Sequence, residues 1–288
     1  MSQPGTLERL LAGQAFIDLS SWRKLAVSGS DAFAWLNDLI SADLTGLARG
    51  ESRRSLLLSP TGRMRADFTV TPYRDGFLLL QDFVHPHAIE RLLGRYVLSS
   101  DVVLDDVTDD VGLFAFPDRF EQPPQVDDAV LATPSCLGSG TDMLIPMEQR
   151  EEVAAMLANV LLKANTNDVE VWRVFRGFPR FGVDVGEDDL PQEGALTDAV
   201  SFEKGCYVGQ EAVAKVRNLG HPRRVLVRVE ASGPLTAGEP VCVDGTEVGT
   251  VTSAVETPKG TRGLAKVRWA ARDGRFATPG GVGVAPVA

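Results

Sequence analysis

The stretch FEKGCYVGQEAV, residues 202–213, places a cysteine among residue types that could activate its thiol. Lys204 precedes Cys206 by two positions, and in an extended segment such residues lie on the same face. An ammonium group near the sulfur would favour the thiolate, which is the nucleophile and the metal ligand. The sequence therefore predicts an accessible, functional thiol at Cys206.

The residues that follow could support or oppose this charge. The run QEAVAKVRN, which begins at Gln210, predicts a short helix whose first N–H groups would stabilise a nearby thiolate. Glu211 would oppose the thiolate unless its carboxylate faces away or pairs with a lysine. The alternative for Cys206 is a small packing residue in a turn. That is the usual state of a free cysteine, and we expect it for Cys136 and Cys242.

The composition limits the class of protein. The 288 residues are 44% hydrophobic and 24% charged, which is ordinary for a globular protein with a large core. No apolar run approaches the roughly 18 residues that span a bilayer, and the first residues lack a secretory pattern, so we expect no membrane partner and a cytoplasmic location. The three dispersed cysteines predict neither a disulfide framework nor a resident metal site.

The net charge of −10 predicts against direct nucleic-acid binding, because such proteins usually present a basic face to phosphates. Basic residues do gather at 53–54 and at 221–224, with Arg217 nearby. We interpret these runs as a solvated face or as a clamp for a small anion.

The sequence pattern divides the chain into three zones. Residues 1–110 alternate strand-like and helix-like segments. Residues 111–218 contain helical and strand patterns followed by a long loop-rich stretch. Residues 219–288 consist of short β-rich runs broken by glycine and proline, which is typical of a small antiparallel barrel or sandwich.

Several elements can be predicted within these zones. Ser30 is expected to cap a helix, and residues 53–81 are expected to form three strands joined by tight turns. Residues 147–165 show the apolar spacing of an amphipathic helix. The β-branched run DVEVWRVFRG, residues 168–177, predicts a strand.

The segment KGCYVGQE, residues 204–211, resembles the signature of the YgfZ family, the folate-binding relatives of the glycine-cleavage T-protein, an aminomethyltransferase. Further segments resemble family elements in the same order: VSGSDAFAWLNDLISADL, LLSPTGRMRADFTV, GRYVLSSDVVLDDVT, RVFRGFPRFGVD and LPQEGAL. The resemblance implies an α+β fold in which ferredoxin-like α/β folate-binding domains surround a central cavity, with a small C-terminal antiparallel β-barrel.

The same resemblance implies a domain plan and a site. Residues 1–110 would be an N-terminal α/β folate-binding domain, 111–218 a second α/β domain carrying the cysteine motif, and 219–288 the barrel. The cofactor would be tetrahydrofolate or a derivative, and Cys206 would carry the chemistry. The implied folate-binding residues are Asp67, Arg173, Phe175, Lys204, Tyr207, Gln210 and Glu211.

Two departures from the T-protein pattern concern carboxylates. T-proteins carry an adjacent pair of aspartates, whereas here Asp67 matches one position and Ala66 fills the other. T-proteins also carry a Leu-Glu pair after the arginine aligned with Arg173, and here Val174 and Phe175 stand there. An aromatic ring can stack on a pterin but cannot accept its N–H donors. These changes argue against full aminomethyl transfer.

The resemblance leaves three functions open. The leading one is a tetrahydrofolate-binding accessory protein that supports the assembly or repair of iron–sulfur enzymes, including tRNA-modifying ones, through Cys206. Its partners would be folate and iron–sulfur enzymes or their assembly factors. The alternatives are a folate-dependent aminomethyltransferase of the T-protein type and a folate-binding scaffold whose cysteine has no chemistry.

Overall fold

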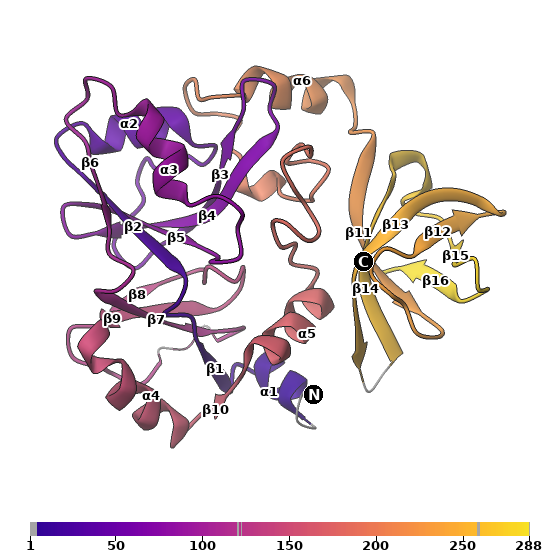
Figure 1. The fold of residues 1–288 in the computed structure, drawn as a ribbon, viewed down its shortest axis with the longest axis horizontal. Helices are drawn as coiled ribbons and strands as arrows, with labels where there is room; N and C mark the ends of the chain where they lie inside the picture. Colours follow the sequence, from indigo (N-terminus) through magenta and orange to yellow (C-terminus); the bar gives the residue numbers. More distant parts are fainter. Residues whose placement is uncertain (1–4, 120, 122, 258–259, 288) are drawn as a thin grey trace. The chain divides into compact units, whose positions relative to one another are not determined.

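The computed structural model describes residues 5–119, 121, 123–257 and 260–287 (Figure 1). The chain forms two compact units that are interleaved along the sequence. The first unit comprises Met1–Leu58, Arg65–Val169 and Asp198–Val208, and the second comprises Ser59–Met64, Glu170–Thr197 and Gly209–Ala288. The predicted domain boundaries after residues 110 and 218 stay a prediction.

One sheet of the first unit has five strands in the order β3-β4-β5-β2-β6. Their bounds are β2 Arg23–Ser28, β3 Arg53–Leu58, β4 Met64–Tyr73, β5 Gly76–Gln81 and β6 Val103–Asp106. Helices α2 (Ala32–Leu39) and α3 (Ile89–Leu93, continued by the 3-10 turn η1, Gly94–Tyr96) pack on one face of it (Figure 1). Trp35 and Leu36 of α2 share a buried core with strand residues such as Leu79. The three strands predicted within 53–81 are confirmed.

The other sheet of the first unit has the order β10-β1-β7-β9-β8. Its strands are β1 Ala15–Asp18, β7 Val111–Phe116, β8 Val130–Ala132, β9 Thr141–Pro146 and β10 Leu162–Lys163, and a short helix α1, Thr6–Leu11, precedes β1. Phe16 and Phe114 pack against Leu157 of α4 (Arg150–Ala158), which follows the 3-10 turn η2, Met147–Gln149. β1 pairs parallel to β10 and antiparallel to β7.

The second unit contains a closed barrel with the cyclic order β11-β14-β13-β12-β15-β16. The strands are β11 Arg224–Ala231, β12 Pro240–Val243, β13 Thr246–Thr257, β14 Gly260–Arg268, β15 Phe276–Ala277 and β16 Gly283–Pro286, with the 3-10 turn η4, Trp269–Ala271, after β14. Inward side chains such as Val241, Val251 and Val267 form its core. The expected α+β fold, with ferredoxin-like sheets and a small C-terminal antiparallel barrel, is confirmed. The central cavity remains a prediction.

Two of the predicted elements are corrected. Residues 168–177 form most of helix α5, Thr166–Arg176, rather than a strand. Their β-branched residues favoured a strand, but Val169 and Trp172 are three residues apart and both are buried, as on one face of a helix. Ser30 does not cap α2, because Asp31 occupies the N-cap position and the Ser30 hydroxyl donates to Asp101 instead.

The predicted helix over 147–165 is shorter in the structure. After α4 ends at Ala158, Leu162 and Lys163 pair with β1 as strand β10, so backbone pairing overrides the apolar helical pattern there. The helix predicted after the cysteine motif is confirmed as α6, Gln210–Leu219. Within the described ranges, no helix combines the length and the apolar character needed to cross a membrane.

Candidate thiol and ligand site

The cysteine segment is held to the chain that follows helix α2. The 3-10 turn η3, Thr197–Ala199, leads into it, and the Ala199 carbonyl accepts a 2.6 Å hydrogen bond from the Ser41 hydroxyl. The Ser201 amide donates to the Ser41 carbonyl at 2.8 Å. These buried bonds join positions about 160 residues apart in sequence and fix the base of the segment.

Lys204 anchors the segment at the end of α2. Its Nζ donates to the carbonyl oxygens of Asn37 and Ile40 at 2.6 Å each and of Ala42 at 2.7 Å. The last carbonyls of a helix lack partners within it, and the helix dipole favours a cation at this end. Burial lowers the pKa of Lys204 to about 8, and the negative charges of Asp43 and Asp38 act in the opposite direction.

The premise that Lys204 and Cys206 share a face of an extended segment is wrong. Residues 202–205 form bends and residues 208–209 a turn, so the alternation of side chains along a strand does not apply. The Lys204 ammonium group lies on three carbonyl oxygens and 4.9 Å from the centre of the Tyr207 ring. Its evident role is therefore to fix the backbone of the motif.

Cys206 itself is exposed and its thiol is free. Together with Asp38, Tyr207 and Val208 it lines a shallow, open hollow of the first unit. The predicted accessible position is confirmed, and a buried packing role for this cysteine is excluded. Cys136 and Cys242 are half-buried, and burial raises the pKa of the Cys136 thiol well above its usual value.

The Tyr207 hydroxyl is a buried polar group that could still form hydrogen bonds. The side chain is only 6% exposed, and among the described residues its hydroxyl has no hydrogen-bond partner. Burial raises the pKa of Tyr207 to about 12, so the group is a neutral phenol at physiological pH. A buried hydroxyl without a partner is costly, and a bound ligand would remove that cost.

Asp67, on β4, is engaged by Arg54 of the neighbouring strand β3. The Arg54 Nε donates to Oδ1 at 2.9 Å, and the second guanidinium nitrogen bonds to Oδ2, which makes the pair bidentate. Ala66 is fully buried with Phe68 in the core shared with α2 and α3. Adjacent strand residues point to opposite faces, so Ala66 and Asp67 lie on different sides of this sheet.

Sequence reasoning missed Gln81, at the end of β5. It is fully buried, and its Oε1 accepts from the Ile89 amide at 3.0 Å and from Arg23 at 3.1 Å. Its Nε2 has no partner within the described part of the chain. The only signal in the sequence is a glutamine that ends the apolar strand GFLLLQ.

Arg173 lies in the second unit, near the end of α5, and is 7% exposed. Its Nε donates to Glu170 at 2.7 Å, and a second nitrogen donates to the buried Asp184 carboxylate at 2.7 Å. The Phe178 carbonyl and the Ser253 hydroxyl also accept from Arg173, at 3.1 and 3.0 Å, and a further guanidinium nitrogen donates to the second carboxylate oxygen of Glu170. The hydrogen bonds of Arg173 thus join helix α5, the loop that follows it and barrel strand β13 within the second unit.

The other predicted residues of the second unit lie on helices. Phe175 is on α5, where the Arg262 guanidinium lies 5.7 Å from the centre of its ring. Gln210 and Glu211 form the first turn of α6, which follows Gly209 in a left-handed conformation at φ 83°. Glu211 is exposed. The folate roles of these residues stay predictions.

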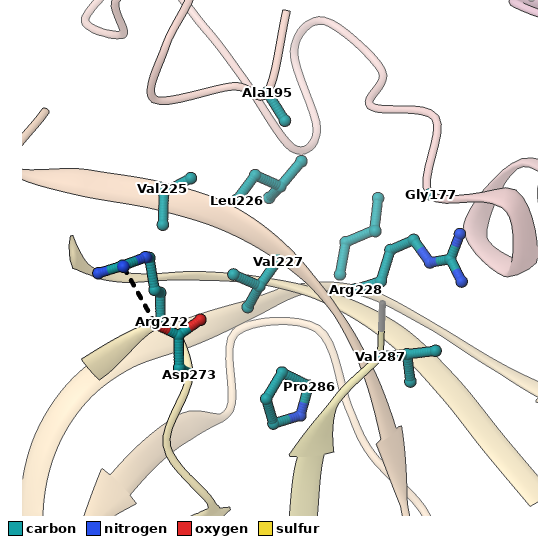
Figure 2. A pocket seen from close by; sticks show the side chains of 11 residues that line it. Gly177, Ala195, Val225, Leu226, Val227, Arg228, Arg272, Asp273, Pro286 and Val287 are labelled. Atoms are coloured by element: carbon teal, nitrogen blue, oxygen red, sulfur yellow. Dashed lines mark ion pairs between the residues drawn. The ribbon is translucent and has the colours of Figure 1, made fainter. Parts of the chain in front are cut away.

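A separate pocket belongs wholly to the second unit (Figure 2). Valine and leucine side chains of β11 line much of it, with Arg228 and Arg272 among the polar lining residues. Arg228 lies against Gly177, whose left-handed φ of 84° and lack of a side chain allow this approach. None of the predicted site residues lines this pocket.

Comparison with known protein families assigns both ends of the chain. Residues 9–116 match the GCVT N-terminal domain, and residues 223–287 match the CAF17 C-terminal beta-barrel domain. The tRNA-modifying protein YgfZ of Vibrio vulnificus strain YJ016 is 26% identical over 231 residues, which cover 74% of this chain and 70% of that protein. The chain thus joins a GCVT N-terminal domain to a CAF17 C-terminal beta-barrel domain and is similar to proteins named tRNA-modifying protein YgfZ. This confirms the resemblance seen at residues 204–211.

Two other similar proteins show the same pattern. The YgfZ protein of Enterobacter sp. strain 638 is 25% identical over 273 residues, which cover 85% of this chain and 82% of that one. A chloroplastic protein of Arabidopsis thaliana is 24% identical over 84% of this chain, but the match spans only 62% of its own length.

A solved structure shares the fold. The aminomethyltransferase T of the Bartonella henselae glycine cleavage system has a TM-score of 0.82 over all of this chain and 89% of that one. The two sequences are 21% identical, so this likeness establishes the fold and leaves the activity to be argued from the site.

Proposed function

We propose that this protein binds tetrahydrofolate or a derivative and, in the cytoplasm, supports the assembly or repair of iron–sulfur enzymes through Cys206. The observation that carries the proposal is the exposed Cys206 thiol beside the buried, unpartnered hydroxyl of Tyr207. Several similar proteins carry the name tRNA-modifying protein YgfZ. This name supports the choice of tRNA-modifying enzymes as the iron–sulfur enzymes that the protein would assist.

The first unit has polar groups that suit a folate. Within the described ranges, Tyr207 Oη and Gln81 Nε2 are buried groups without hydrogen-bond partners, and both can donate to acceptor atoms of a pterin or of its glutamate amide. When bound, tetrahydrofolate supplies two amine nitrogens that can carry a one-carbon unit. The Asp67 carboxylate is already paired with Arg54, so its contribution to a folate site would be to hold the Arg54 guanidinium group in position.

The thiol would act together with a partner protein. Among the described residues, no three side chains of the usual ligand types gather closely enough to hold a metal ion. A cluster or an iron atom held through Cys206 would therefore take its other ligands from the client or assembly factor. An exposed sulfur on an anchored backbone suits such a transient contact, or thiol exchange with a partner.

The direct test replaces Cys206 with serine in cells that depend on this protein. We expect the activity of iron–sulfur enzymes, including tRNA-modifying ones, to fall to the level of the deletion strain. Cys242→Ser is the matched control, because that thiol is half-buried in the barrel strand β12. Undiminished activity in Cys206→Ser at equal protein level would remove the proposed role.

The folate half of the proposal needs its own measurement. We expect purified protein to bind tetrahydrofolate in a fluorescence titration, and Tyr207→Phe to bind it more weakly. An assay with tetrahydrofolate and an aminomethyl-lipoyl donor separates the proposal from aminomethyl transfer. Release of ammonia with methylene-tetrahydrofolate would favour the aminomethyltransferase, although Ala66, packed in the core, stands where T-proteins have a carboxylate.

A further inference from the structure

Two segments of the second unit are strongly basic although the chain as a whole is acidic. Residues 217–228 contain four arginines and no acidic residue. Residues 266–275 contain one lysine, three arginines and a single carboxylate, Asp273. The net charge of the whole chain is −10, so these segments reverse the average.

The barrel brings the two segments together as neighbouring strand ends. In the β11–β14 ladder Arg224 lies directly opposite Arg268, and both are exposed. At the other end of the same ladder Glu230 is opposite Arg262, and their side chains form an ion pair at 2.8 Å. Like charges directly opposite each other destabilise a sheet.

The Arg224–Arg268 pair differs from the neighbouring basic residues in its ion pairing. In the part of the chain that the structure describes, no carboxylate forms an ion pair with either guanidinium group, whereas Lys266 is paired with Asp189 and Arg272 with Asp273. Figure 2 shows the Arg272–Asp273 pair. An anion bound between the two exposed arginines would attract both guanidinium groups and so offset their mutual repulsion.

A flat stack of side chains adjoins this pair. The His221 ring lies parallel to the Trp269 ring, with centroids 5.2 Å apart and an interplanar angle of 6°. The Arg272 guanidinium lies 4.1 Å from the centre of the Trp269 ring. The Trp269 amide donates to the Arg223 carbonyl at 2.9 Å, which fixes the stack beside the Arg224–Arg268 ladder end. His221 is exposed.

We propose that this basic–aromatic surface, formed by His221, Arg223, Arg224, Arg268, Trp269 and Arg272, binds an unpaired stretch of nucleic acid. Phosphate oxygens match the exposed guanidinium groups, and a base can stack on the exposed imidazole that ends the stack. A duplex keeps its bases stacked on one another and cannot use this platform. An acidic peptide would satisfy the arginines but leave the flat stack unused.

The proposed surface runs against the expectation from the net charge, which predicted that direct nucleic-acid binding is unlikely. Net charge averages over the chain, whereas phosphate binding depends on the charges that face the ligand. The sequence predicts a solvated face or a clamp for a small anion at the basic run 221–224. Its pairing with residues 268–272 depends on the register of the barrel strands, which the sequence does not display.

Fluorescence polarisation with a labelled uridine-rich 12-nucleotide RNA tests the proposal on the full chain. We expect salt-dependent binding to the single strand and much weaker binding to the same sequence as a duplex. The double variant R224A/R268A should lower the slope of log K against log salt by about 1.4, or about 0.7 for each lost phosphate contact. His221→Ala should weaken binding by at least about fivefold through lost stacking.

Arg91→Ala is the control, because that exposed arginine lies on α3 of the first unit. Equal binding by wild type and R224A/R268A, or equal losses in Arg91→Ala, would overturn the proposal. Equal affinity for the duplex, or competition by polyglutamate as effective as by unlabelled RNA, would overturn it as well. Circular dichroism of each variant verifies folding. The proposal uses neither Cys206 nor folate, so its failure leaves the proposed function standing.

Discussion

Arg173 and Lys204 are both cations of the predicted site, but their surroundings differ. Arg173 is surrounded by satisfied groups, since Glu170, Asp184 and Ser253 accept its donors and Asp184 also accepts from Thr252 and Ser253. Lys204 is also fully hydrogen-bonded, but the neighbouring Tyr207 hydroxyl has no hydrogen-bond partner in the described part of the chain, and Cys206 is exposed. A ligand site is therefore marked by polar groups that still lack hydrogen-bond partners. A charged side chain whose hydrogen bonds are all made within the protein has a structural role.

The largest effect is expected at Arg173. Arg173→Met leaves the Asp184 carboxylate, which is 1% exposed, buried without its cation, and should lower the free energy of unfolding by about 3–5 kcal/mol. Urea denaturation measures this change, with the exposed Arg275→Met as a control of the same unit. A variant of unchanged stability that no longer binds folate would show that Arg173 serves the ligand instead.

A smaller, pH-dependent effect is expected at Lys204. Lys204→Met leaves three carbonyls without their donor and should lower the free energy of unfolding at pH 7 by about 1–3 kcal/mol. The pKa of Lys204 is about 8 in the folded chain, against an ordinary value of 10.5. Between pH 8 and pH 10.5 the Lys204 amine is therefore protonated in the unfolded chain but largely neutral in the folded chain. Stability of the wild type should therefore rise with pH across this window relative to the variant.

Urea denaturation at several pH values between 7 and 10.5 provides the measurement. Lys163→Met is the control, because Lys163 is exposed on β10 of the same unit and should leave the pH curve of the wild type unchanged. Parallel curves for wild type and Lys204→Met would show that Lys204 keeps an ordinary pKa.

The smallest change in stability is expected at Tyr207. Tyr207→Phe removes a buried hydroxyl that has no partner, so the free protein should be equally stable or more stable by up to about 1 kcal/mol. Tetrahydrofolate affinity should nevertheless fall about fivefold, the equivalent of one neutral hydrogen bond. Tyr73→Phe, on β4, is the control. Unchanged folate affinity would place the ligand elsewhere.

The sequence predicted the elements whose signals are local. The glycine- and proline-punctuated runs after residue 220 predicted the barrel, and the turns at 60–62 and 75–76 predicted the three strands β3, β4 and β5. It failed where a tertiary contact outweighs propensity, as in α5, whose Trp172 is fully buried.

The candidate site was predicted in part for the same reason. The exposure of Cys206 agreed with its polar neighbours in sequence. The true partners of Lys204 are carbonyls about 160 residues earlier in the chain, and no spacing rule within residues 202–213 could reveal them. Gln81 was missed because an unpartnered amide can be recognised only when its surroundings are known.

The position of β1 has a consequence for the order of folding. β1 lies between β7 and β10 in its sheet, but residues 23–106 build the other sheet before either partner strand appears in the chain. During synthesis the sheet built from residues 23–106 can pack against α2 and α3 early. Strand β1, Ala15–Asp18, can pair only after residues 111–163 have been made. The second sheet is thus closed by contacts of long sequence separation, which makes its completion the slower step.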